Sequence, residues 1–263
     1  MRRNLRFVLL LIKLKLSHIM VFRLSFFGGF FADGMLFLVQ LLAFSAIYGH
    51  VDTIGNWSRG QMLIFIGTFS MLNGINMLIY FFGVNSIPGK ISSGELDNYV
   101  TKPVSPLLRL TFENINLGSA PLLLMSGMII AYGVSLEGIT LTFPLLLGYS
   151  ILVILMAVLY YDMELILRTI PFLVISANAI MRLEDPILDL NFKIPGVLFK
   201  GALKIIFYFI LPYGIMATVP TQFLTETLSF AGLIQALSVV VVFTAFALWF
   251  WRFGLKHYKS ASS

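Results

Sequence analysis

The sequence contains no cysteine, which excludes disulfide bonds, thiolate metal sites and cysteine nucleophiles. Charge is also scarce, because only 11% of the 263 residues are charged, against about a quarter in a soluble domain. Hydrophobic residues make up 59% of the chain, more than a soluble fold of this length could bury. A lipid bilayer is therefore the expected solvent.

Long apolar runs fill most of the chain, and a membrane-spanning helix needs roughly 20 such residues. Backbone groups in lipid must be hydrogen-bonded within their own segment, so each run is expected to be a helix. The sequence predicts a single all-α integral membrane domain, 1–263, with six transmembrane helices. Five spans are expected at 26–48, 62–84, 115–134, 141–161 and 233–251.

Basic residues gather at both ends of the chain. The set before the first predicted span is Arg2, Arg3, Arg6, Lys13, Lys15 and Arg23, and the set after the last is Arg252, Lys256 and Lys259. Basic flanks mark cytoplasmic ends, so both termini are expected in the cytoplasm, which requires an even number of spans. The net charge of +6 is thus a topology signal and does not predict binding to nucleic acid.

The N-terminal residues 1–24 have an amphipathic pattern. An apolar face is formed at helical spacing by Leu5, Val8, Ile12, Leu16 and Ile19. With basic residues beside it, this face predicts an interface helix that lies in the inner headgroup layer of the membrane lipid.

One hydrophilic segment, 88–110, interrupts the apolar runs. Gly94, Pro103 and Pro106 supply turns, and Glu95, Asp97 and Lys102 supply charge. A segment of more than about 20 residues with its own patterning exceeds an ordinary connector. We expect it to lie in the cytoplasm and to dock another protein.

Prolines break the apolar region 162–222, and two layouts fit it. In the first, span five is 164–183, and 195–220 forms a re-entrant hairpin that dips from the outer face. In the second, 162–204 lies inside along the membrane and span five is 205–223. The prolines favour the first layout, and Lys193, Lys200 and Lys204 favour the second.

No catalytic or metal site is expected. The segment GVNSIPGKIS has five residues between its glycines instead of the four of a phosphate-binding loop, and Ile91 stands where Ser or Thr is required. The histidines, His18, His50 and His257, are expected near opposite faces of the membrane, so they form no ligand cluster. The chain is therefore not expected to be an enzyme or to bind a cofactor itself.

Polar residues recur inside two predicted spans. Asn73, Asn76 and Tyr80 share one helical face in the second span, and Asp33 and Gln40 share a face in the first. Such a stripe must face protein or water. It predicts either the wall of a translocation path or hydrogen bonds that hold helices together.

The segment SSGELDNYVTKPVSPLLRL resembles the signature of a bacterial permease family within the type 2 ABC transporters. The matching positions are Gly94, Glu95, Leu96, Asp97, Lys102, Pro103, Val104 and Pro106. Two later segments resemble other elements of that family: ILPYGIMATVPTQFL, through Pro212, Ala217 and Pro220, and WRFGLKHYKSAS, through Trp251, Gly254, Leu255, Tyr258 and Ser260. Val100 departs from a common leucine, and Tyr160–Asp189 matches least.

The resemblance implies a permease of the bacterial plasma membrane that pairs with a second permease, identical or related, and with two cytoplasmic ATPase subunits. ATP and Mg²⁺ would bind those partners. Segment 88–110 would hold the coupling helix, and 195–220 the outer hairpin, which favours the first layout. The resemblance also implies that the transporter exports its substrate from the cell.

Two other classes compete with this interpretation. An ion-coupled secondary transporter needs deep, paired ionisable residues, and the predicted span cores contain almost none. A membrane-embedded enzyme needs a catalytic constellation, which the sequence lacks.

Overall fold

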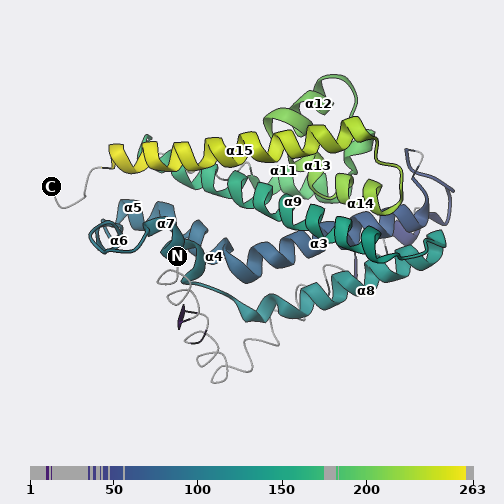
Figure 1. The fold of residues 1–263 in the computed structure, drawn as a ribbon, viewed down its shortest axis with the longest axis horizontal. Coiled ribbons are helices and arrows are strands. Elements are labelled where there is room, and N and C mark those ends of the chain that lie inside the picture. Colours follow the sequence, from purple (N-terminus) through teal and green to yellow (C-terminus); the bar gives the residue numbers. More distant parts are fainter. Residues whose placement is uncertain are drawn as a thin grey trace.

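The computed structural model describes residues 48–55, 57–174, 182 and 184–258, with scattered positions between 10 and 46. Its named elements are helical (Figure 1). The long helices are α3 (Arg59–Ile79), α8 (Ala120–Glu137), α9 (Phe143–Thr169) and α15 (Phe230–His257). Within the described residues, four helices are long and apolar enough to cross a membrane, or five if one bent pair counts as a span.

Glycines on α3 form a seam against the antiparallel helix α8. Gly60, Gly67 and Gly74 recur every seven residues, the interval that keeps one face toward a partner helix. The side chains that face them on α8 recur at the same interval: Glu137, Ile130 and Leu123. A Cβ added at Gly67 would lie 2.7 Å from Ile130 Cγ1 and 3.1 Å from Ile130 N. Close backbone approach of this kind is how helices pack in lipid, where no hydrophobic force drives them together.

Helices α9 and α15 run in the same direction. The rings of Phe172, just after α9, and Trp251, near the end of α15, have centroids 5.6 Å apart. At the other end, Gly148 of α9 packs against the ring of Phe223, which precedes α15 in the chain. Since both helices end on the same side, the chain between them returns from one end of the bundle to the other.

A sharply bent helical pair lies in this returning region. Its first arm is α12 (Gly201–Ile205) with the π-helical turn η4 (Ile206–Ile210), and its second is α13 (Tyr213–Met216) with α14 (Thr218–Leu224). The arms meet at 79°. Pro212 at the break lacks an N–H and cannot continue the first arm. A bend of this kind is found both in re-entrant loops and in broken spans, so both layouts for 195–223 remain predictions.

The expected spans correspond to the described helices unevenly. The runs at 62–84, 115–134 and 233–251 overlap Arg59–Ile79, Leu117–Glu137 and Phe230–His257. The expected boundary between spans at 141–161 and 164–183 is absent, because α9 continues unbroken through Glu164 to Thr169. Most of 1–24 and 26–48, and 175–181 of the expected fifth span, lie outside the described residues. The count of six spans stays a prediction.

Substitution of Gly67 by leucine should separate α3 from α8. The added side chain meets Ile130 side-chain and backbone atoms, and overpacking of this kind costs about 1–3 kcal/mol. Thermal unfolding of the full chain in detergent measures the loss. Gly127→Leu is the matched control, because nothing lies within 4 Å of a Cβ added at Gly127. Equal melting temperatures for the two variants would contradict the seam.

Candidate functional site

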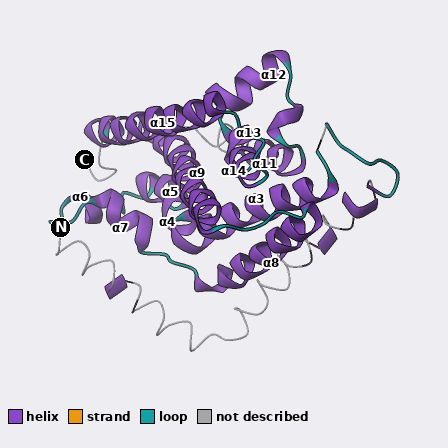
Figure 2. Ribbon diagram, turned by 45° about the vertical axis from the view of Figure 1, so that its right-hand side comes forward, coloured by secondary structure: helices purple, strands orange, loops and turns teal. Residues whose placement is uncertain are grey.

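The predicted docking segment folds as three short helices at one end of the bundle. They are α5 (Ile87–Ser92), α6 (Asp97–Val100) and α7 (Pro106–Phe112). Gly94 reverses the chain after α5 with a φ of +73°, which L side chains rarely adopt. Pro106 begins α7, where its missing N–H costs nothing. Figure 2 shows these helices beside the end of α15, so the C-terminal helix ends on the same side of the bundle.

Tyr99 organises the interior of this docking segment. Its hydroxyl donates to Glu113 Oε1 at 2.9 Å, and the Arg109 guanidinium lies 4.2 Å from the ring centroid. Lys90 Nζ lies 4.9 Å from the same centroid and pairs with Glu95 Oε1 at 2.9 Å. Burial raises the pKa of Tyr99, so the hydroxyl stays protonated and keeps its donor role at neutral pH. These contacts fix the shape of the segment from within.

The predicted docking residues divide into an exposed set and an anchoring set. Glu95, Lys102 and Pro103 are exposed. Gly94, Asp97 and Pro106 are half-buried. Leu96 is fully buried, so it stabilises the segment and offers no surface to a partner. Three neighbours that were not predicted to dock a partner are also exposed: Asn98, Val100 and Thr101.

An apolar cluster joins the docking segment to the long helices. From the segment and the adjoining helix α4 (Phe81–Asn85) come Val84, Ile87, Leu96, Tyr99 and Leu110. From α9, the 3₁₀ turn η2 (Ile170–Phe172) and α15 come Leu165, Phe172, Ala247 and Trp251. Gly83 makes the join possible, since a Cβ added there would lie 1.8 Å from Leu110 O. The segment is therefore packed against the bundle and does not hang from it as a free loop.

A polar cavity of about 530 Å³ lies between α3, α4, α9 and α11 (Glu184–Lys193). Its polar lining is Asn73, Asn76, Asn85, Tyr160, Glu164, Arg168, Arg182, Glu184 and Asp185. The structure thus brings Asn73 and Asn76 to one cavity. Tyr80 is placed elsewhere, because its hydroxyl donates to Ala157 O at 3.2 Å and it lines a separate apolar hollow. Gln40 lies outside the described residues.

A buried ion cluster forms one wall of this polar cavity. Arg168 Nη1 lies 2.8 Å from Glu184 Oε2, and Arg168 Nη2 lies 3.4 Å from Glu164 Oε2. Arg168 Nε donates to Asn85 Oδ1 at 3.0 Å, so the cluster also holds α4, just before the docking segment. Burial raises the pKa of Glu184 although Arg168 opposes the shift. Arg168 is therefore the cation that both buried glutamates contact.

This cluster was not predicted from the sequence. Almost no deep ionisable groups and no paired acids were expected, whereas Glu164 and Glu184 are both at most 3% exposed and share Arg168. Glu164 and Arg168 are four residues apart on one helix, a spacing that puts both on one face and was readable in the sequence. The contribution of Glu184, from another helix, was not readable.

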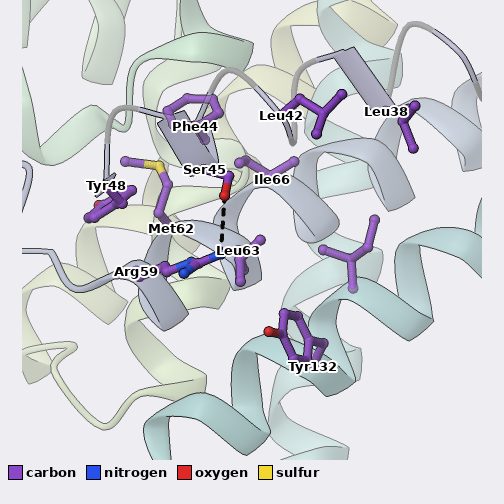
Figure 3. A pocket seen from close by; sticks show the side chains of 11 residues that line it. Leu38, Leu42, Phe44, Ser45, Tyr48, Arg59, Met62, Leu63, Ile66 and Tyr132 are labelled. Carbon is purple, nitrogen blue, oxygen red and sulfur yellow. Dashed lines mark hydrogen bonds between the residues drawn. The ribbon is translucent and has the colours of Figure 1, made fainter. Parts of the chain in front are cut away.

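A smaller apolar pocket lies at the opposite end of α3 (Figure 3). Its volume is about 220 Å³, and Leu38, Leu42 and Ile66 contribute to its walls. Arg59 Nη2 donates to Ser45 Oγ at 3.2 Å inside it. Among the described residues, no group of three His, Cys, Asp or Glu side chains could hold a metal ion.

Comparison with known proteins gives a family match over most of the chain. A family model described as "ABC-2 family transporter protein" matches residues 34–262. No curated protein and no solved structure matches the chain. The matched range contains the docking segment, the polar cavity and the bent pair.

Removal of the arginine from the buried ion cluster should destabilise the protein strongly. Arg168→Met leaves Glu164 and Glu184 buried without a cation, a change that costs about 3–5 kcal/mol. Lys193→Met is the control, because it removes the cation of the exposed pair with Asp189, for which about 0–1 kcal/mol is expected. Thermal unfolding in detergent compares the two. A similar small loss for both would show that the cluster contributes no stability.

Proposed function

The chain belongs to the ABC-2 transporter family, and from this premise we propose that it is the membrane permease subunit of an ATP-driven exporter. Two cytoplasmic ATPase subunits bind ATP and Mg²⁺, and a second permease, identical or related, completes the assembly. The membrane is the bacterial plasma membrane, with the docking segment and both termini in the cytoplasm. ATP binding closes the ATPases, which push the docking segment and open a path to the outside.

The docking segment is the observation that supports this proposal most strongly. It exposes Glu95, Asn98 and Lys102 at its surface, while its interior is held by Tyr99. A surface with both signs of charge suits a protein partner, for which complementary charge gives specificity. The apolar cluster would transmit a displacement of the docking segment to α9 and α15, because packed side chains connect α6 to both helices.

The polar cavity supports the location of the translocation path. Asn73 and Asn76 line it from α3, and the ion cluster lines it from α9 and α11. Asn85 and Pro88 reach the same cavity from the start of the docking segment. A displacement of the docking segment would therefore change the shape of the cavity directly.

An ion-coupled carrier is the second candidate, and the buried ion cluster favours it. Ionisable groups at membrane depth are the parts from which such carriers build coupling sites. The two functions separate in proteoliposomes that contain the chain without any ATPase. Uptake driven by an imposed proton or sodium gradient would support the carrier, whereas transport that requires the ATPase and ATP supports the exporter.

Reversal or removal of a charge on the docking segment should weaken ATPase binding. The chain is co-expressed with a candidate ABC ATPase subunit, and co-purification is quantified for Lys102→Glu and Asp97→Ala. A loss of about tenfold in affinity is expected for reversal of one interface charge. Lys200→Glu makes the same charge change as Lys102→Glu in the exposed N-cap residue of α12 and should leave co-purification unchanged.

The side of the membrane on which the docking segment lies can be tested separately, because the chain has no cysteine of its own. Asn98→Cys creates a single exposed thiol on α6. A membrane-impermeant maleimide should label it in inverted vesicles and not in intact cells. Labelling from outside intact cells, or full co-purification of both docking variants, would overturn the proposal.

A further inference from the structure

The polar cavity contains a buried acceptor that the protein does not satisfy. Asn76 is 1% exposed and lines the cavity, yet its Oδ1 atom has no hydrogen-bond partner among the described residues. A buried acceptor without a donor costs about 1–3 kcal/mol. The oxygen lines the cavity, so a donor group of a bound ligand could satisfy it.

Negative charge exceeds positive charge around the same cavity. Its lining includes the acids Glu164, Glu184 and Asp185 against the bases Arg168 and Arg182. Arg168 is already engaged by both glutamates and by Asn85. Asp185 and Arg182 are exposed at the rim, where water screens them. Inside, two carboxylates share a single guanidinium, which leaves a site that attracts a cation.

Two aromatic rings in the cavity lining favour an organic ammonium ion as the bound cation. Phe81 and Tyr160 both line the cavity, and a ring face attracts an ammonium group through its quadrupole. Among the described residues there is no set of three acidic, His or Cys side chains for a metal ion. The volume of about 530 Å³ lies within the range of small-molecule sites, roughly 300–1,000 Å³.

We infer that the polar cavity binds an amine-bearing organic cation, with its ammonium group between Glu164 and Asn76 Oδ1 and its apolar part against Phe81 and Tyr160. The ammonium group supplies the hydrogen-bond donor that Asn76 Oδ1 lacks. It also supplies a second positive charge beside two glutamates that share one arginine. The identification of this cation as cargo rests on the proposed function, but its binding does not. Asn85 and Pro88 connect the occupied cavity to the docking segment, so cargo and ATPase would act on the same short stretch of chain.

A matched pair of fluorescent ligands tests the site. Dansylcadaverine carries a primary ammonium and an aromatic ring, and its N-acetyl derivative differs by the loss of that charge. The purified full chain in nonionic detergent is titrated with each by fluorescence anisotropy, without any ATPase. The amine should bind at least about tenfold more tightly than the acetylated form, because only the amine pairs with a buried carboxylate.

Variants locate the binding within the chain. Glu164→Gln should weaken dansylcadaverine binding about tenfold, and Asn76→Leu should weaken it by a smaller factor, while both bring the two ligands closer in affinity. Asp189→Asn removes a carboxylate from the exposed face of α11 and should change nothing. Thermal melting accompanies each titration, and Asn76→Leu provides the decisive variant if Glu164→Gln melts early.

Equal affinity of the wild-type chain for the amine and its acetylated form would overturn the inference. So would unchanged discrimination between them in a well-folded Glu164→Gln or Asn76→Leu chain. The proposed function fails on a different measurement, the absence of ATPase co-purification. A chain that binds the amine without recruiting an ATPase would keep the site and lose the exporter.

Discussion

The close approach of α4 to α7 is the contact on which the rest of the arrangement depends. Gly83 lies so near Leu110 O that no side chain fits between them, and Ile87, Leu96 and Tyr99 fill the space around this contact. Because the cluster continues into Leu165, Phe172 and Trp251, the hydrophilic segment shares one apolar core with two membrane helices. This hydrophilic segment is therefore packed into the helical bundle. Such packing would be needed for a partner that binds the segment to move the membrane helices.

Hydropathy was enough to predict the apolar helices α3, α8 and α15. It failed at α9, where buried acidic side chains have partners in the fold. The runs that became α3, α8 and α15 were located to within a few residues. The long helix α9 was expected to end at 161, with a separate span at 164–183 in the first layout. In the fold, Asp162 accepts a hydrogen bond from Thr244 of α15 at 2.5 Å, and Arg168 neutralises Glu164. Thr244 is 82 residues from Asp162, so no local window of sequence reveals it, whereas Arg168 is only four residues from Glu164.

The candidate sites show the same division between local and distant information. Glycine, proline and charge within one stretch predicted the docking segment, and helical spacing brought Asn73 and Asn76 to one cavity. Tyr80 was assigned to the same face, but α3 ends at Ile79, and Tyr80 has a non-helical φ of −131°, which turns it away. Glu184 completes the ion cluster from a separate helix, so no periodicity could connect it to Arg168. Leu96 matched a signature position, yet only the fold shows that it serves as an anchor.

The glycine seam between α3 and α8 has a consequence for movement. Interlocked backbones without intervening side chains slide poorly, so these helices are expected to travel together as one stiff lever. In the proposed export cycle, the irregular residue Tyr80 would be the pivot, because it separates this pair of helices from α4 and the docking segment that follows. A small rotation at Tyr80 would tilt Asn73 and Asn76 relative to Arg168, so the polar cavity between them would widen or narrow in each transport cycle.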